Sequence, residues 1–303
     1  VFMLVKNNFT SGLFAGVLLV IVLGLDIANV LPNAMPPLNE LPQLVRPPRL
    51  KDNFTFAGEK LPMNVDTRER MEKELLVNSY YHTSTVLAIK NAPRFFPMIE
   101  KILKEEGIPD DFKYLAVAES NLSNASSSAG AKGLWQFLKG TAGDFGLEVN
   151  TEVEERFHYE KSTRAAAKFI RYLYDRTGSW VNAAGAYNMG LANLNKTLET
   201  QREKSIFDLN VNDETSRYIF RIVALKEILS MPQAYGFYVD EDQKYQPIKN
   251  VKEVAVNSPV ENLSDLAHQY GLSYRMLKYY NPWLIDSKLS AKDKTYTILI
   301  PTK

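Results

Sequence analysis

The 303-residue chain contains no cysteine. Within these residues, disulfide bonds, thiol catalysis and thiolate metal ligands are therefore excluded, and we expect no lipid-modified N-terminal cysteine. Histidine is scarce too: His82, His158 and His268 are scattered, and no two of them stand at metal-ligand spacing. We interpret all three as structural or solvated residues and expect no metal site.

An excess of charge of one sign is also missing. The chain has 36 Lys and Arg residues against 35 Asp and Glu residues, a formal net charge of +1. This balance gives no reason to expect nucleic acid as a partner. With 45% hydrophobic and 23% charged residues, the chain can bury at least one sizeable core, and its length predicts about two domains.

The apolar run near the N-terminus is short. It extends from Gly12 to Leu25, follows Lys6 and ends before Asp26. A comfortable membrane span needs about 18 to 20 apolar residues, whereas a shorter run after a positive charge is typical of a signal peptide. We therefore expect residues 1–30 to be a signal peptide or an uncleaved N-terminal membrane anchor, and the rest of the chain to be exported.

Prolines are concentrated in the next stretch. Proline interrupts both helices and sheet ladders, so residues 31–65 are expected to be an extended linker. The prolines concerned are Pro32, Pro36, Pro37, Pro42, Pro47, Pro48 and Pro62.

Helical spacing dominates residues 66–235. The clearest helix places Phe95, Met98, Ile99, Ile102 and Leu103 at i, i+3, i+4, i+7 and i+8, with Gly107 as its stop. Strand alternation is not visible between residues 66 and 231, so this domain is predicted to be almost entirely helical. Asp66 and Ser162 are expected N-caps, and further helices are expected from Pro109 to Glu119 and over 141–146, 180–187 and 213–229.

The pattern changes after a second linker at 236–250. Residues 251–256 are strand-like, Asn262 and Ser273 can cap helices over 263–270 and 274–280, and residues 295–300 are again β-rich. The order strand, helix, helix, strand predicts a small module over 251–303 that buries one sheet face under two helices. Such a module is too small for a deep active site, so we expect a binding role.

Glu119 is the strongest candidate for catalysis. It directly follows the weakly polar run from Tyr114 to Ala118, and the next carboxylate in the chain is Asp144. A carboxyl group on an apolar helical segment is costly to ionise, so its pKa is expected to rise and it can hold a proton near neutral pH. This is the profile of a general acid. The alternative is a surface residue or the partner of a nearby Lys or Arg.

The segment after Glu119 is rich in small residues. Gly130 and Gly133 allow close backbone approach, and Trp135 with Gln136 offers a flat surface and an amide. A sugar-binding cleft needs both features. Packing of Trp135 in the core remains an equal alternative.

Several short segments of the helical region and of the C-terminal module form a recognisable series. In the helical region they are Glu119-Ser120, Gly130-Ala131-Lys132-Gly133-Leu134-Trp135-Gln136, Thr141-Ala142, Glu155-Arg156, Ser162-Thr163, Ala165-Ala166-Ala167 and Ala186-Tyr187-Asn188-Met189-Gly190. In the last 53 or so residues they are Asn262-Leu263, Tyr270-Gly271-Leu272-Ser273, Asn281-Pro282 and Ile300-Pro301. In order and approximate spacing the first series resembles the family 1 lytic transglycosylases, and the second resembles a LysM module.

The resemblance implies a mainly α protein with a lysozyme-like catalytic domain and a small βααβ LysM-like module. It implies glycan strands of peptidoglycan as the partner, in the periplasm, and cleavage between N-acetylmuramic acid and N-acetylglucosamine with formation of a 1,6-anhydro ring. Glu119 would be the single acid and base, and no cofactor is required. The residues implied to bind substrate are Ser127, Gln136, Tyr187, Asn188 and Tyr218.

Two departures from the family pattern are visible. Ser127-Ser128 stands where the family has Ser-Pro, so Ser127 is the better match and Ser128 the rival. The stretch from Asn257 to Glu261 replaces the usual Gly-Asp turn at the LysM entry. The alternatives left open are a hydrolytic muramidase of the goose type, which would use the same Glu119 with water, and a non-catalytic scaffold that binds the cell wall.

Overall fold

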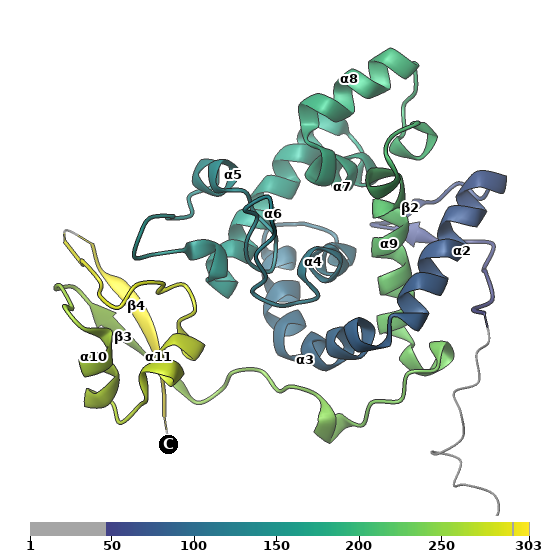
Figure 1. Cartoon of the computed structure of the whole chain (residues 1–303). Helices are drawn as coiled ribbons and strands as arrows, with labels where there is room; N and C mark the ends of the chain where they lie inside the picture. Colours follow the sequence, from purple (N-terminus) through teal and green to yellow (C-terminus); the bar gives the residue numbers. More distant parts are fainter. Residues whose placement is uncertain (1–46, 293, 303) are drawn as a thin grey trace, which may run out of the picture. The chain divides into compact units, whose positions relative to one another are not determined.

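The computed structural model describes residues 47–292 and 294–302 (Figure 1). The predicted signal or anchor segment and most of the proline-rich stretch lie outside these residues. Among the described residues, none of the helices combines the length and the apolar character needed to cross a membrane.

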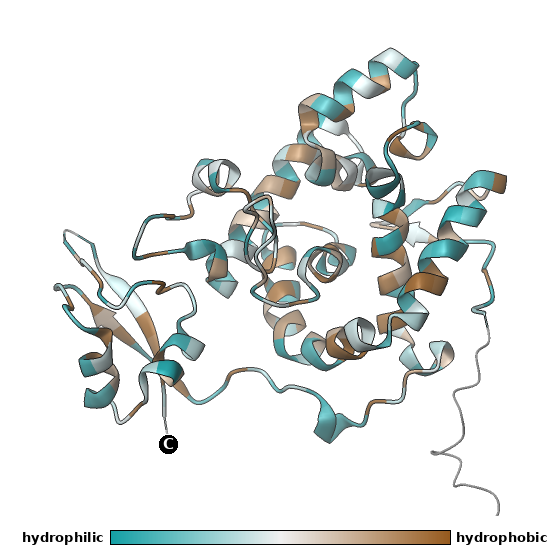
Figure 2. Ribbon diagram, in the orientation of Figure 1, coloured by the Kyte–Doolittle hydropathy of each residue, from teal (hydrophilic) through white to brown (hydrophobic). Residues whose placement is uncertain are grey.

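The helical body agrees with the prediction of a mainly α domain. Its helices pack around one hydrophobic core, and Figure 2 shows their hydrophobic residues largely on the inner faces. The helices are α2 (Val65–Tyr80), α3 (His82–Glu105), α4 (Lys113–Ser120), α5 (Lys139–Asp144), α6 (Tyr159–Thr177), α7 (Trp180–Met189), α8 (Leu191–Gln201) and α9 (Asp213–Ser230), joined by the short 3-10 turns η2 (Asp110–Phe112), η3 (Glu155–Phe157) and η4 (Ile206–Asp208).

Helix α4 lies inside the ring formed by α3, α6, α7 and α9 (Figure 1). Its small and apolar side chains Leu115, Ala116 and Val117 are at most 2% exposed, and the helix packs against α3 and α9. It ends where Asn121 takes a left-handed conformation, with φ at 55°. Because α4 is buried along most of its length, its last turn is held rigidly where Glu119 stands.

A small hairpin precedes the first helix. Strands β1 (Thr55–Phe56) and β2 (Glu59–Lys60) pair antiparallel, and the neighbouring Phe54, Phe56 and Leu61 belong to the main core. The proline pattern assigned this stretch to the linker over 31–65. The structure corrects that boundary, because three large apolar side chains anchor residues 54–61 in the helical body.

Two helix starts also differ from the prediction. The N-cap of α2 is Asn64, whose side chain accepts a hydrogen bond from the Thr67 amide at 2.9 Å, so Asp66 falls in the first turn. Helix α6 begins after His158, whose side chain accepts from the Lys161 amide at 3.4 Å, so Ser162 lies inside the helix. In both helices the N-cap is the residue whose side chain accepts a hydrogen bond from the backbone amide three positions later.

Helix α8 has no counterpart in the sequence-based prediction. Leu194 is its only fully buried residue, and Figure 2 shows many hydrophilic residues along the helix. Leu191, Leu194 and Leu198 stand at i, i+3 and i+7 and pack on the core, a short helical period that the prediction overlooked.

The C-terminal module has the predicted βααβ order. Strands β3 (Val251–Val256) and β4 (Tyr296–Pro301) pair antiparallel, from Val251 opposite Pro301 to Val256 opposite Tyr296. Helices α10 (Leu263–Gln269) and α11 (Tyr274–Tyr280) begin after the predicted caps Asn262 and Ser273. Leu263, Ala267, Leu277, Ile298 and Ile300 form the centre of its core.

The module also contacts the segment that follows α5. Val153 is 1% exposed and belongs to the core cluster of the module. The Glu154 amide donates to the Trp283 carbonyl at 2.8 Å, and the Ile285 amide donates to the Glu152 carbonyl at 2.9 Å. These contacts join the C-terminal module to the helical body beyond the covalent linker.

Candidate active site

Glu119 stands one residue before the end of α4, half-buried, and accepts a hydrogen bond from the Tyr218 hydroxyl of α9. Burial is the largest influence on this carboxyl and raises its pKa from 4.5 to about 7. The Tyr218 hydrogen bond and the positive charge of Arg221 oppose this rise, and the negative charge of Glu214 adds to it. The predicted proton-holding acid is thus present.

Two tyrosines face Glu119 from different helices. Tyr218 is 2% exposed, and Tyr187, from α7, donates its hydroxyl to the Trp135 carbonyl at 2.6 Å. Burial raises the pKa of each hydroxyl well above 10, and the charge of Glu119 raises both further. Both tyrosines therefore remain protonated donors at neutral pH. The structure thus brings three of the predicted site residues together.

The loop from Ser126 to Phe137 folds back on itself beside α4. The Gly133 amide donates to the Ala125 carbonyl at 2.9 Å, and the Lys132 and Phe137 backbones exchange two bonds at 3.1 Å. Ser120 Oγ lies 2.8 Å from the Leu134 carbonyl, which ties the loop to the end of α4. The backbone after Glu119 is therefore fixed by hydrogen bonds.

Gly133 confirms the predicted close backbone approach. Its φ is +84°, and a Cβ placed there would lie 1.9 Å from the Arg156 carbonyl oxygen. Gly130 has a similar φ of +81°, but a Cβ there would meet no atom within 4 Å. Only Gly133 is therefore required by packing as well as by backbone conformation.

Arg156 holds the loop from Ser126 to Phe137 through hydrogen bonds to its backbone. It is 4% exposed, and its guanidinium donates to the Gly130 and Phe137 carbonyls, both at 2.9 Å. The same guanidinium forms a bidentate pair with Glu154, with both N–O distances at 2.7 Å. The Glu155-Arg156 motif noted in the sequence therefore holds the loop through Arg156.

Gln136 and Ser127 lie on the loop in different ways. Gln136 Nε2 donates to the Ala125 and Gly133 carbonyls at 3.1 and 2.9 Å, which leaves its side-chain oxygen as an acceptor. Ser127 is exposed, and its Oγ accepts from the Ala131 amide at 3.0 Å. Gln136 follows Trp135, whose carbonyl accepts the hydrogen bond from Tyr187. Within the described part of the chain, Ser127 forms no hydrogen bond with the residues around Glu119.

Trp135 belongs to the core. It is 0% exposed, and its indole N–H donates to Thr163 Oγ1 at 2.9 Å. Of the two interpretations of this residue, core packing is therefore correct, and stacking on a sugar is not available to it.

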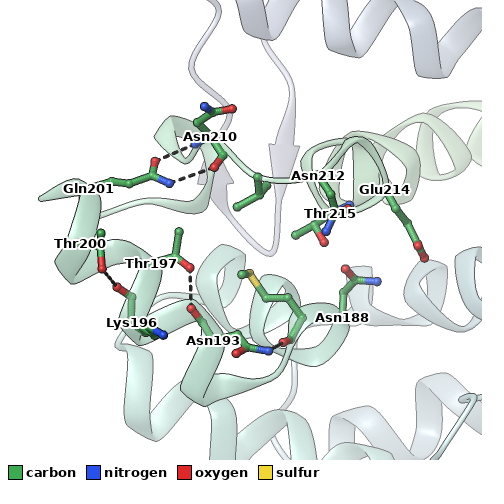
Figure 3. Close-up of a pocket in the computed structure, with 12 residues that line it drawn as sticks. Asn188, Asn193, Lys196, Thr197, Thr200, Gln201, Asn210, Asn212, Glu214 and Thr215 are labelled. Atoms are coloured by element: carbon green, nitrogen blue, oxygen red, sulfur yellow. Dashed lines mark hydrogen bonds between the residues drawn. The ribbon is translucent and has the colours of Figure 1, made fainter.

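A polar pocket of about 720 Å³ has Glu214, whose charge acts on Glu119, in its lining (Figure 3). Asn188, at the end of α7, and Glu214, in the first turn of α9, form one of its ends. Sequence reasoning missed Glu214, which is 95 positions from Glu119 in the chain and has no local motif. Arg221, one helical turn beyond Tyr218, was missed for the same reason.

The two modules match known domain families. Residues 96–210 match the Transglycosylase SLT domain, and residues 252–303 match the Soluble lytic transglycosylase C-terminal LysM-like domain. The chain thus contains an SLT transglycosylase domain followed by a LysM-like module, in accordance with the resemblance noted in the sequence.

Among curated proteins the chain is similar to Membrane-bound lytic murein transglycosylase D of Escherichia coli K12. The two are 27% identical over 262 residues, which cover 83% of this chain and 56% of the relative. The protein of the same name from a second Escherichia coli strain gives the same values. The chain therefore spans about half the length of the curated relatives it matches.

One similar solved structure is that of an inactive mutant of lytic transglycosylase Slt from Pseudomonas aeruginosa. It shares 20% sequence identity with this chain at a TM-score of 0.36, covering 50% of this chain and 26% of the other.

Proposed function

We propose that this protein is a lytic transglycosylase that acts on peptidoglycan. It cleaves the β-1,4 bond between N-acetylmuramic acid and N-acetylglucosamine and forms a 1,6-anhydro ring on the muramic acid. The observation that carries the proposal is Glu119, an acid with a pKa of about 7 that is bonded to Tyr218 at the end of a buried helix. The SLT domain match supports the same activity.

In the first step, protonated Glu119 donates its proton to the glycosidic oxygen, and the bond from this oxygen to C1 of the muramic acid breaks. A general acid works best with a pKa near the working pH, which the burial of Glu119 provides. The N-acetyl carbonyl of the same sugar stabilises the developing positive charge at C1.

In the second step, the C6 hydroxyl of the muramic acid attacks C1, and the Glu119 carboxylate takes up its proton. The anhydro ring closes and the acid is regenerated, so protons and bonds balance without water. The Tyr218 hydroxyl stabilises the carboxylate between the two steps, because it donates a hydrogen bond to it.

Glu214 is the second carboxylate to be considered. Two-carboxylate glycosidases use a second acid as base or nucleophile about 5 to 9 Å from the first. Glu214 is exposed and influences Glu119 through charge, without a hydrogen bond to it. We assign it an electrostatic role, in which its negative charge helps to keep the proton on Glu119.

The remaining predicted residues act on the bound strand. The side-chain oxygen of Gln136 and the amide of Asn188 contact acetamido groups, and Ser127 contacts the strand from the exposed side of the loop. The LysM-like module binds the same polymer, and the N-terminal segment exports the protein to the periplasm or anchors it in the membrane. Glycan strands are the only partner in this proposal.

Replacement of Glu119 tests the proposal. Glu119→Gln keeps the shape of the side chain and an acceptor for Tyr218 but cannot donate a proton, so cleavage of purified cell wall should fall by about 10³-fold or more. A circular dichroism spectrum like that of the wild type would show that the fold is intact. If the variant were about as active as the wild type, Glu119 would not be the catalytic acid. If the wild type bound cell wall without cleaving it, the scaffold alternative would be favoured.

A further inference from the structure

The polar pocket that has Asn188 and Glu214 at one end extends well beyond these two residues. It lies between α8 and the stretch from Asn210 to Thr215, which leads into α9 (Figure 3). Its lining is rich in amides and hydroxyls, with Met189 and Val211 as apolar contributions. A volume of about 720 Å³ is large enough for several amide-linked residues or a sugar unit.

Much of this lining is fixed by its own hydrogen bonds. Gln201 and Asn210 exchange two bonds of 2.9 and 2.8 Å, so that α8 is clamped to the opposite wall. Thr197 donates to the Asn193 carbonyl at 2.7 Å. The pocket is therefore shaped in advance, which lowers the entropy cost of binding a flexible ligand.

Two side chains of the pocket, those of Asn188 and Lys196, are available to form hydrogen bonds with a ligand. Among residues 47–292 and 294–302, no hydrogen bond or ion pair links the side chain of Asn188 or of Lys196 to another group. Lys196 is exposed on α8, at the other end of the pocket from Asn188 and Glu214 (Figure 3). The pocket thus offers a free amide at the end that also holds Glu214 and a free positive charge at the other end.

This layout fits a particular part of the polymer. N-acetylmuramic acid bears a peptide stem, a short chain of amide groups that carries carboxylates. Glu214, at one end of the pocket, is near enough for its charge to act on Glu119, so the stem of a sugar bound at Glu119 can enter the pocket from this end. A stem that runs along the pocket would meet amide groups first and a cation later, which matches its own order of amide and carboxylate.

We infer that the pocket between α8 and the start of α9 is a binding site for the peptide stem, in which Lys196 binds a stem carboxylate. The inference rests on the proposed function, because it takes peptidoglycan as the substrate. Under it, α8 is the element that makes the enzyme distinguish strands with stems from bare glycan. A polar helix with one buried residue is well suited to that task.

The test compares two substrates with the same glycan. Strands with intact stems and strands from which an amidase has removed the stems are cleaved by the wild type, Lys196→Met and Lys196→Arg. Lys168→Met is the matched control, since Lys168 is an exposed lysine of α6 without a role in the site. We expect Lys196→Met to raise KM for stemmed strands by about two- to fivefold, as for loss of one exposed ion pair, with no change on bare strands.

Lys196→Arg should restore most of the affinity, and Lys168→Met should behave as the wild type on both substrates. An equal loss on both substrates would overturn the inference, because the pocket would then bind glycan, and so would no change on either. Cleavage of bare strands by the wild type tests the proposed function alone. A wild type that cleaves neither substrate would overturn both.

Discussion

The Tyr218 hydroxyl donates a hydrogen bond to the Glu119 carboxyl, which joins the middle of α9 to the end of α4 across 99 positions of the chain. A bond to the charged form of an acid lowers its pKa, whereas burial of the same acid raises it. The pKa of about 7 is the result of these opposing influences, and each can be removed separately.

Removal of the hydroxyl by Tyr218→Phe should raise the pKa of Glu119 above about 7. Because the acid must be protonated for the first step, the alkaline limb of the profile of kcat/KM against pH should move to higher pH. The maximal rate should fall by about ten- to a hundredfold, since a bond to a charged group stabilises the carboxylate by about 1.5 to 3 kcal/mol. A limb that moves to lower pH would contradict this assignment.

Glu214→Gln should have the opposite effect. The negative charge of Glu214 raises the pKa of Glu119, so its removal should lower that pKa and move the alkaline limb to lower pH, with kcat at pH 5 nearly unchanged. Glu199→Gln, an exposed residue of α8, is the control and should leave the profile as it is. If Glu214→Gln abolished cleavage at every pH, Glu214 would act as a base or nucleophile, as in a hydrolase.

Glu119 should also make stability depend on pH. Its pKa is about 7 in the folded state against 4.5 as the ordinary value, so the folded state holds the proton more tightly. The free energy of unfolding should therefore decrease by about 2 to 3 kcal/mol as pH rises from about 4.5 to above 7. Urea unfolding at pH 5 and pH 8 measures this loss. Glu119→Gln should lack it, and parallel behaviour of the two proteins would refute the buried-acid interpretation.

Gly133→Ala and Gly130→Ala form a matched pair. Both glycines have φ above +80°, but only at Gly133 would a Cβ collide with backbone, at 1.9 Å from the Arg156 carbonyl oxygen. Gly130→Ala should cost about 1 to 2 kcal/mol of unfolding free energy. Gly133→Ala should cost several kcal/mol in all, because the loop must move away from Arg156. Equal melting temperatures for the two variants would show that this close approach does not constrain the loop.

The sequence predicted best those features that depend on neighbours in the chain. Asn262 and Ser273 cap α10 and α11 through their own side chains, so the C-terminal module followed from short patterns. The pKa of Glu119 followed from the apolar residues directly before it. In each case the sequence signal lies within about one or two helical turns, although the burial that raises the pKa of Glu119 also depends on the packing of α4 against other helices.

The sequence did not predict features that depend on residues distant in the chain or on weak patterns. Glu214 and Arg221 reach Glu119 only through the packing of α9 on α4, and no local pattern indicates this contact. The β1–β2 hairpin has strands of two residues each, too short for an alternation signal, and neighbouring prolines suggested a linker. Tyr218 was identified by resemblance alone, since its partner is 99 positions away.

The origin of the closing nucleophile is the central claim, and cleavage in water labelled with a heavy oxygen isotope tests it most directly. Because the C6 hydroxyl of the sugar closes the ring, we expect every new muramic acid end to be one water lighter than a hydrolysed end and to contain no heavy oxygen. Reducing ends that contain the label would show that water attacks C1, and would place the enzyme among the hydrolases.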